Sequence, residues 1–365
     1  MKKNLIFFMS DFSFGGAGNS ISKLCLNLPP KKYNISIISL GKCAYSKILK
    51  KKKIDVYELK NKRLFFSIED IKKLLKKKLN KDRKNILISN IHYNNIILAL
   101  LAKKINNLKI VLVERTPLEE LNISFSIKDF FKKKIIKFLI NCTYPLADMI
   151  IVNSKGIKNG FPNNLKKKIK VIYPPAIIKR LKPKKFIENP KKLKAVCFSR
   201  LSVEKNLECA IKSFGYLENI NLSLTIYGNG KLKEKLTKLV DSLNLKNRVF
   251  FKSHTKNVIK EMKKFNILIS SSFFEGCSNS IIEALNNDLV VLASDCPGGN
   301  KEILSNGKSG ELFISDNEYD LSLKIKKIIK NFINYKYKYR NHRHKLENFL
   351  LSKNVQDYNK VFDNI

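Results

Sequence analysis

The chain has 365 residues, of which 44% are hydrophobic and 28% are charged, and its formal net charge is +42. A chain longer than about 300 residues exceeds what one hydrophobic core usually holds, so two domains are expected. The composition excludes a disordered chain, and no apolar run reaches the roughly 20 residues that a membrane-spanning helix needs.

The positive charge comes almost entirely from lysine. Eight of the 72 basic residues are Arg, although a surface that grips phosphates is expected to use Arg, whose planar fork binds phosphate with two hydrogen bonds. Coding bias with ordinary solvation, an anionic membrane and nucleic acid are three explanations of the surplus. Because lysines are spread over every predicted helix, rather than gathered in one patch with interleaved aromatic residues, no nucleic-acid partner is expected.

Cysteine usage and the first residues indicate the compartment. The seven cysteines are scattered and never spaced as C-x-x-C, so neither a disulfide framework nor a zinc site is predicted. The apolar run at residues 5–9 follows two lysines, as in a signal peptide, but it is short and ends at Asp11. A buried first strand explains it better, and we expect a cytoplasmic protein.

Short apolar runs alternate with lysine-rich amphipathic stretches along the chain, which is typical of parallel strands covered by helices. The runs lie at residues 5–9, 35–40, 86–89, 110–113 and 149–152, and again at 195–198, 222–227, 249–251, 267–270 and 290–293. We therefore predict an α/β fold with two Rossmann-like, doubly wound domains.

A stretch rich in Lys and Pro separates the two series of runs and is interpreted as a linker. We place the first domain at residues 1–178, the linker at 179–192 and the second domain at 193–345. A last helical segment, 346–365, is expected to pack back on the first domain.

The most informative segment follows the strand predicted at 267–270. Residues 271–285 read SSFFEGCSNSIIEAL. Gly276 permits a tight turn, and a side chain at the start of the next helix can cap it. The amides of that first turn then form an anion site that suits a diphosphate. The residues concerned are Ser278, Asn279, Ser280 and Ile281.

Two glutamates stand eight residues apart in this segment. The pattern F-E-G-x-S-x-S-x-x-E-A-L resembles the signature of retaining glycosyltransferases of family 4, whose GT-B fold has two facing Rossmann-like domains with a cleft between them. The resemblance implies that Glu283 binds the donor ribose and that Glu275 contacts the donor sugar near the reacting centre. An ordinary capped helix with one buried and one exposed glutamate is the alternative.

The segment FSRLSVEKN at residues 198–206 resembles the same family's G-R-L-x-x-E-K-N, which follows the first strand of the donor domain. The resemblance implies that Arg200 and Lys205 clamp the donor diphosphate and act in catalysis. Ser199 stands where the family usually has Gly. The alternative is a solvated basic pair.

Two glycine-rich turns also match the family. Gly228 and Gly230 end a predicted strand in IYGNG and resemble a turn that lines the donor cleft. Gly15 and Gly16, in FGGAG after the first strand, resemble a loop whose amides approach the donor. A dinucleotide site is the rival interpretation of this loop, but the G-x-G-x-x-G spacing is absent.

The sequence leaves the roles of three further residues open. Relatives often carry a histidine after a later strand of the first domain, close to the donor sugar, and Arg115 stands at that place. His92 is another candidate, with a histidine packed under a loop as the alternative. His254 is either a nucleobase neighbour or a surface histidine.

Residues 127–142 form a predicted amphipathic helix. Its apolar face holds Ile127, Phe130, Phe131, Ile135, Phe138 and Leu139, with Lys132, Lys133 and Lys137 mostly opposite. Such a helix either lies on an anionic bilayer or turns its apolar face to the core and its lysines to solvent.

The resemblance implies an enzyme that moves a hexose or N-acetylhexosamine, with retention, from a UDP- or GDP-sugar to a hydroxyl of a glycan or lipid-linked glycan. It assigns the acceptor to the first domain and the donor to the second. Cell-surface polysaccharide, lipopolysaccharide or glycolipid synthesis at the cytoplasmic face of a membrane is the expected setting.

Oriented amides and fixed cations would stabilise the leaving diphosphate. Because no D-x-D occurs, we expect no metal and no cofactor. The alternatives are a nucleotide-sugar epimerase or phosphorylase of the same fold and, in another class, a basic nucleic-acid-binding protein.

Overall fold

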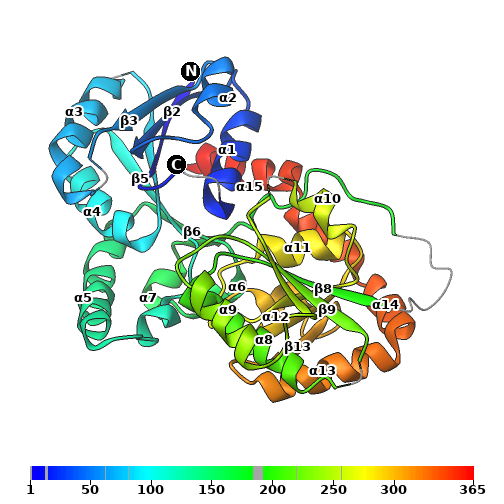
Figure 1. The fold of residues 1–365 in the computed structure, drawn as a ribbon. Helices are drawn as coiled ribbons and strands as arrows, with labels where there is room; N and C mark the ends of the chain where they lie inside the picture. Colours follow the sequence, from blue (N-terminus) through cyan, green and yellow to red (C-terminus); the bar gives the residue numbers. More distant parts are fainter. Residues whose placement is uncertain are drawn as a thin grey trace. The chain divides into compact units, whose positions relative to one another are not determined.

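The structure, a computed structural model, describes residues 2–12, 15–61, 63–80, 82–183, 192–218, 220–255 and 257–365. The chain forms two compact units, the first made of Met1–Pro175 with Leu351–Ile365 and the second of Ala176–Leu350. Each unit is a parallel sheet with helices on its faces (Figure 1). The sequence places the boundaries at 178 and 345, and residues 184–191 of the predicted linker lie outside the described residues.

The first unit has a seven-stranded parallel sheet in the order β3-β2-β1-β4-β5-β6-β7. The strand order reverses between β1 and β4, and ligands of such sheets bind at the carboxyl edge near that point. The strands are β1 (Lys3–Met9), β2 (Tyr33–Leu40), β3 (Asp55–Leu59), β4 (Asn85–Asn90), β5 (Leu108–Glu114), β6 (Met149–Val152) and β7 (Ile169–Val171).

Successive side chains of β1 enter two different cores, because they point to opposite faces of the sheet. Ile6 and Phe8 join the core under α3 (Ile68–Lys78), α4 (His92–Lys103) and α5 (Ile127–Thr143). Leu5 and Phe7 join the core under α1 and α15. The helices are α1 (Gly16–Asn27), α2 (Ser46–Lys51), α3 (Ile68–Lys78), α4 (His92–Lys103), α5 (Ile127–Thr143), α6 (Lys155–Asn159), α7 (Asn163–Lys166) and α15 (Leu351–Asn364), with short 3₁₀ turns η1 (Phe65–Ser67), η2 (Leu118–Asn122) and η3 (Tyr144–Leu146).

The C-terminal helix α15 completes the core of the first unit. Phe362 is fully buried, and its ring meets those of Phe7 and Tyr33 edge-on at 6.4 and 5.8 Å between centroids. Lys3 Nζ donates to the Phe362 carbonyl. The first strand and the last helix are thereby fastened together, although they lie at opposite ends of the sequence.

The second unit has a six-stranded parallel sheet in the order β10-β9-β8-β11-β12-β13, with its reversal between β8 and β11. The strands are β8 (Leu193–Phe198), β9 (Leu222–Tyr227), β10 (Val249–Lys252), β11 (Ile267–Ser270), β12 (Val290–Asp295) and β13 (Glu311–Ile314). The helices are α8 (Leu207–Gly215), α9 (Lys233–Ser242), α10 (Val258–Met262), α11 (Asn279–Asn286), α12 (Asn300–Ile303), α13 (Glu318–Lys330) and α14 (Phe332–Arg340), with 3₁₀ turns η4 (Val203–Lys205) and η5 (Arg343–Phe349).

All ten predicted apolar runs form strands. Strands β3, β7 and β13 were not predicted from the sequence, and each lies at a sheet edge. Edge strands are partly solvated on one side, so they carry a weaker apolar signal.

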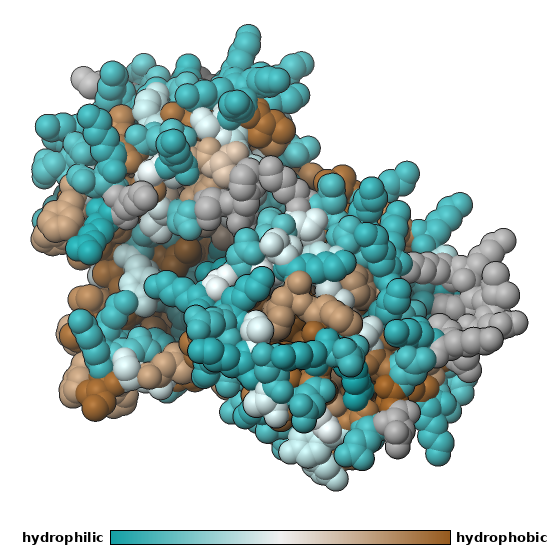
Figure 2. Space-filling view, viewed as in Figure 1, coloured by the Kyte–Doolittle hydropathy of each residue, from teal (hydrophilic) through white to brown (hydrophobic). Residues whose placement is uncertain are grey.

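Helix α5 turns its apolar face outward. Ile127, Phe131 and Phe138 are 79%, 61% and 66% exposed, and hydrophobic side chains are visible over this helix in the space-filling view (Figure 2). Lys133, by contrast, is buried and donates to the Ile123 carbonyl at 2.6 Å. The core-facing interpretation of this apolar face is therefore wrong. Within the described ranges, none of the helices combines the length and the apolar character that a bilayer crossing requires.

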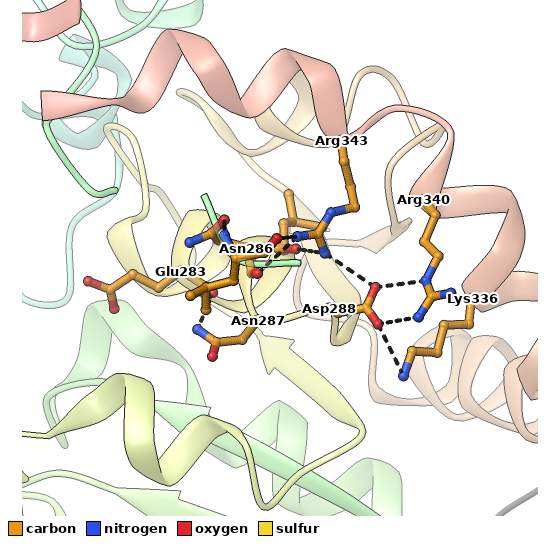
Figure 3. A network of polar contacts seen from close by, with 9 residues as sticks. Glu283, Asn286, Asn287, Asp288, Lys336, Arg340 and Arg343 are labelled. Carbon is orange, nitrogen blue, oxygen red and sulfur yellow. Dashed lines mark hydrogen bonds and ion pairs between the residues drawn. The ribbon is translucent and has the colours of Figure 1, made fainter. Parts of the chain in front are cut away.

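The C-terminal end of α11 is fixed by a cluster of cations around one carboxylate (Figure 3). Asp288, nearly buried and at φ 65°, pairs with Arg340 Nη2 at 2.6 Å, Arg343 Nη1 at 3.2 Å and Lys336 Nζ at 3.6 Å. Arg343 also donates to the carbonyls of Leu285 and Asn286, at 3.0 and 3.1 Å. Cations stabilise a helix C-terminus, because its last carbonyls lack partners within the helix.

Asp288→Asn is expected to lower the free energy of unfolding by about 3–5 kcal/mol, because three largely buried cations lose their shared carboxylate. Asn tolerates the left-handed backbone at this position, so the change isolates the charge. Urea denaturation measures the effect. Asp241→Asn, which removes an exposed partner of Lys246, is the control and should change stability by less than about 1 kcal/mol. Equal effects of the two changes would contradict the role of the cluster.

Candidate functional site

Two loops meet at the carboxyl edge of the second sheet, where its strand order reverses. One loop follows β8 and the other follows β11. The Ser271 hydroxyl donates to the Lys205 carbonyl at 3.1 Å, and the Phe273 amide donates to the Glu204 carbonyl at 3.0 Å. These bonds bring the predicted residues of both loops together.

Lys205 and Glu275 form the central ion pair of this edge. Lys205 Nζ lies 2.5 Å from Glu275 Oε1, and the two side chains are 17% and 15% exposed. The Ser272 hydroxyl donates to the same carboxylate oxygen at 2.9 Å. Water screens such a pair less than a surface pair, so both groups are held in place.

The Glu275 backbone is fixed as well. Its amide donates to the Pro297 carbonyl at 3.1 Å, and its carbonyl accepts from the Gly299 amide at 3.0 Å. This carboxylate is therefore anchored between the loops that follow β11 and β12.

Arg200 has a different environment. Its side chain is 76% exposed and pairs with Glu204 at 3.0 Å. Burial would raise the pKa of Glu204, but a hydrogen bond from Ser202 and the charges of Arg200 and Lys205 outweigh it and lower that pKa. An exposed guanidinium of this kind is weakly held and can turn toward a ligand.

Gly228 and Gly230 allow the loop that carries Arg200 to pack closely against the loop after β9. A Cβ at Gly228 would stand 1.9 Å from the Ser199 carbonyl oxygen, and one at Gly230 would stand 2.2 Å from the Leu201 carbonyl oxygen. The Leu201 amide donates to the Asn229 carbonyl at 3.0 Å. No side chain fits between the two loops, which is a steric reason for both glycines.

The predicted side-chain cap of α11 is not formed. Ser278 occupies the cap position, but its hydroxyl lies 3.0 Å from the Ser280 hydroxyl and bonds no helix amide. The Asn279 Oδ1 atom is buried and has no hydrogen-bond partner among the described residues. Ile281 is a core residue, so its backbone is the part that can face a ligand. The first turn of α11 keeps amide donors that no cap side chain uses.

Glu283 lies further along α11. Its side chain is partly exposed, and it points away from Asp288 and Arg343 in the close-up view (Figure 3). Its carbonyl accepts from the amide and the side chain of Asn287, at 2.9 and 2.8 Å. The carboxylate is thus separate from the cluster that fixes the end of the helix.

In the first unit, Gly15 and Gly16 lie exposed at the start of α1. The backbone of Gly15 is extended, with φ −179°, and a Cβ there would meet no atom within 4 Å. Packing in this unit therefore does not explain the glycine. Phe14, in the same motif, lies outside the described residues.

His92 is a buried histidine, the alternative that the sequence left open. Its ring nitrogens lie 3.7 Å from Glu114 Oε1 and 3.3 Å from Glu120 Oε1. Burial lowers the pKa of His92, but the hydrogen bond and charge of Glu114 and the charge of Glu120 outweigh it and raise the pKa above 6.5. His254 is exposed in the loop after β10.

The preceding residue, Ile91, has φ 75°. This backbone conformation is rare and strained for a β-branched side chain.

Two residues that support the Glu275 loop were not predicted from the sequence. The buried Ser294 hydroxyl donates to the Ser272 carbonyl at 2.6 Å, and the buried Asn300 side chain donates to the Ser294 carbonyl at 3.1 Å. They fasten the end of β12 and the start of α12 to the loop that carries Glu275. Ser and Asn are common in loops, so the sequence held no signal that singled them out.

Comparison with known proteins shows which protein family the second unit resembles. Residues 178–347 match the family described as Glycosyl transferases group 1. A Campylobacter jejuni protein is 31% identical over 208 residues, covering 56% of this chain and 57% of its own length. It is the N-acetylgalactosamine-N,N'-diacetylbacillosaminyl-diphospho-undecaprenol 4-alpha-N-acetylgalactosaminyltransferase.

A second Campylobacter jejuni protein, an alpha-1,4-N-acetyl-D-galactosaminyltransferase named for a diphospho-undecaprenol-linked glycan, is 26% identical and covers 88% of each chain. The chain spans little more than half the length of the first curated relatives that it matches, 57% and 55%.

Among solved structures, Anabaena HepE in complex with UDP-glucose is similar, with a TM-score of 0.79, 16% identity, and 99% of this chain and 100% of that chain covered. Together with the two parallel sheets, this likeness confirms the predicted fold class, GT-B with two doubly wound domains.

Gly228→Ala is expected to destabilise the protein by about 1–3 kcal/mol, because the new methyl overlaps a backbone carbonyl that cannot move without the Arg200 loop. Thermal or urea unfolding measures the loss. Gly215→Ala is the matched control, since a Cβ there meets nothing within 4 Å, and this change in helix α8 should be neutral or stabilising by up to about 1 kcal/mol. A neutral Gly228→Ala would show that the two loops are not held by this contact.

Proposed function

Residues 178–347 belong to the glycosyl transferases group 1 family, and from this premise we propose that the protein is a retaining glycosyltransferase of family 4. It transfers a hexose or N-acetylhexosamine from a nucleoside-diphosphate sugar to a hydroxyl of a glycan or lipid-linked glycan. The observation that carries the proposal is the Lys205–Glu275 pair, fixed at the strand-order reversal beside the start of α11.

The second unit supplies the groups that a leaving diphosphate needs. The first turn of α11, at residues 278–281, offers backbone amides that a phosphate can accept from. Lys205 is held in place by Glu275, and Arg200 is exposed beside it. Fixed donors and cations stabilise the negative charge that develops on the diphosphate without reorganising as the bond breaks. We propose that they do so without a metal ion or a cofactor.

The remaining donor contacts follow from the same arrangement. Glu283 accepts hydrogen bonds from the ribose hydroxyls, and Glu275 positions the sugar near the reacting centre. Gly15 and Gly16 give the donor access to the amides at the start of α1, and the space around Gly15 is open, since a Cβ there would meet no atom within 4 Å. We propose UDP as the nucleotide, since similar folds include HepE with UDP-glucose.

The acceptor is proposed to be a lipid-linked glycan at the cytoplasmic face of a membrane. Both Campylobacter jejuni relatives are named for diphospho-undecaprenol-linked glycans. The product would enter cell-surface polysaccharide, lipopolysaccharide or glycolipid synthesis.

Helix α5 supports a peripheral contact with the membrane. Its outward face presents aromatic and aliphatic side chains to water, which costs free energy unless another apolar phase covers them. Lys128, Lys134 and Lys137 are exposed on the same helix. Apolar residues beside lysines fit the headgroup region of an anionic bilayer. A second copy of this chain fits less well, because its net charge of +42 opposes self-association.

UDP is expected to raise the thermal unfolding midpoint of the protein in the presence of EDTA. At 100 times its dissociation constant, a ligand stabilises by about 2.7 kcal/mol. Glu283→Ala should lose most of this response, and Glu234→Ala, an exposed glutamate of α9, should keep it. GDP, ADP and CMP are the comparison nucleotides. Failure of every nucleotide to shift the midpoint would overturn the donor site.

The double variant Phe131→Glu and Phe138→Glu is expected to weaken binding to vesicles that contain anionic phospholipid by at least tenfold, because each change removes an exposed aromatic ring that would enter the bilayer and adds repulsion. Vesicle co-sedimentation measures the affinity. Phe250→Glu, at an exposed position of the second unit, is the matched control and should bind like the unchanged protein. Undiminished binding of the double variant would exclude α5 as the docking helix.

A further inference from the structure

A small pocket lies at the carboxyl edge of the first sheet. Its enclosed volume is about 10 Å³, and the empty space grows to about 200 Å³ when the open solvent at its mouth is included. Every residue that lines it belongs to the first unit. Its polar walls are Ser20 of α1, Arg115 after β5, Asn153 after β6, and Asn354 and Tyr358 of α15.

Arg115 is the charged group of this pocket. Strands β4 and β5 are neighbours, so Asn90 at the end of β4 stands beside Arg115. The Asn90 side chain donates to the Phe8 carbonyl at 3.3 Å, which turns its oxygen toward Arg115 Nε at 3.2 Å. The guanidinium is thus oriented through its Nε atom.

The other end of the guanidinium is uncommitted. Among the described residues, the terminal nitrogens of Arg115 have no hydrogen-bond partner and form no ion pair. The adjacent Glu114 forms no ion pair with the guanidinium. Its carboxylate accepts instead from the Tyr144 hydroxyl at 2.6 Å and from the Arg115 backbone amide at 3.0 Å. Burial lowers the pKa of Arg115 and outweighs the charges of Tyr358 and Glu114, which act to raise it, as expected for a largely buried cation that forms no ion pair among the described residues.

A second polar group in the pocket also lacks a partner. The Asn354 side chain is 2% exposed and donates to the Tyr173 carbonyl at 2.6 Å. Its Oδ1 atom is buried and has no hydrogen-bond partner among the described residues. Buried acceptors are normally satisfied, so an exception calls for an explanation by a ligand or a water molecule.

We propose that this pocket binds a phosphate group of the acceptor, with Arg115 as the residue that recognises it. A guanidinium fork matches two phosphate oxygens, and such charge-assisted bonds are stronger than neutral ones. Asn354 Oδ1 accepts from a protonated phosphate oxygen or from a hydroxyl next to the phosphate. The proposal rests on the proposed function in that it names the chemical class of acceptor, a phosphate-bearing one.

The position fits the fold. Ligands of doubly wound sheets bind outside the carboxyl ends of the strands, and residues of this pocket follow β5, β6 and β7. Pro174 and Pro175 form part of its rim. Proline has no backbone N–H, so the rim offers no amide there that could replace the guanidinium as the donor.

The test measures phosphate binding with the donor site blocked. The full chain is saturated with UDP, and inorganic phosphate, glycerol phosphate and farnesyl diphosphate are titrated in turn against sodium chloride of equal ionic strength. Thermal shift and calorimetry are the readouts. The unchanged protein should bind at least one of these phosphates, and Arg115→Gln should bind it roughly tenfold or more weakly, because charged hydrogen bonds are lost.

Arg115→Lys keeps the charge but not the fork, and should bind with intermediate affinity. Arg63→Gln, an exposed arginine of the same unit, is the control and should bind phosphate like the unchanged protein. Tightest binding of farnesyl diphosphate would identify a lipid diphosphate as the source, and tightest binding of glycerol phosphate would identify a polyol phosphate.

Three results would overturn the proposal: no phosphate bound beyond the chloride effect, binding that Arg115→Gln leaves unchanged, or a loss of UDP affinity in Arg115→Gln equal to the loss for phosphate. A protein that ignores every nucleotide but binds phosphate through Arg115 would instead contradict the donor site and leave the pocket supported.

Discussion

Parallel pairing of buried strands is the constraint on which both units depend. Because β8 and β11 are neighbours that run the same way, the loops that follow them must leave from the same edge of the sheet. Lys205 and Glu275, 70 residues apart in the sequence, meet there as a consequence. The backbone bonds around Glu275 and the glycines at 228 and 230 then reduce the freedom of both loops. The site is built mainly from backbone geometry, with few charged side chains.

The first unit repeats this arrangement with different chemistry. Its strand order reverses between β1 and β4, and the neighbouring strand ends carry Asn90 and Arg115 instead of a lysine and a glutamate. Glu114 is turned into the protein by Tyr144, so its carboxylate forms no ion pair with the Arg115 guanidinium. In the second unit Lys205 is paired with Glu275 within the protein, whereas in the first unit our proposal gives Arg115 a phosphate of the acceptor as its partner. The two edges therefore suit different partners.

Charge and hydrophobicity act separately on the surface of this protein. The net charge of +42 is spread over many helices, but on α5 the apolar residues face outward while Lys133 is bonded inside. A lysine satisfied by a carbonyl and by Asp129 can occupy an inner face. The helical spacing of the apolar residues of α5 is the same whether their face points to solvent or to the core, so the sequence does not distinguish the two orientations.

Several features follow from the sequence by itself. Continuous apolar runs predicted the ten strands, since a strand buried on both faces must be apolar throughout, and the spacing of Glu275 and Glu283 indicated the family. The edge strands, the buried position of His92 and the outward face of α5 were decided by the tertiary structure. So were the missing cap at Ser278 and the free end of Arg115. In each case the outcome depends on which groups from distant parts of the chain arrive as partners, and local spacing carries no information about them.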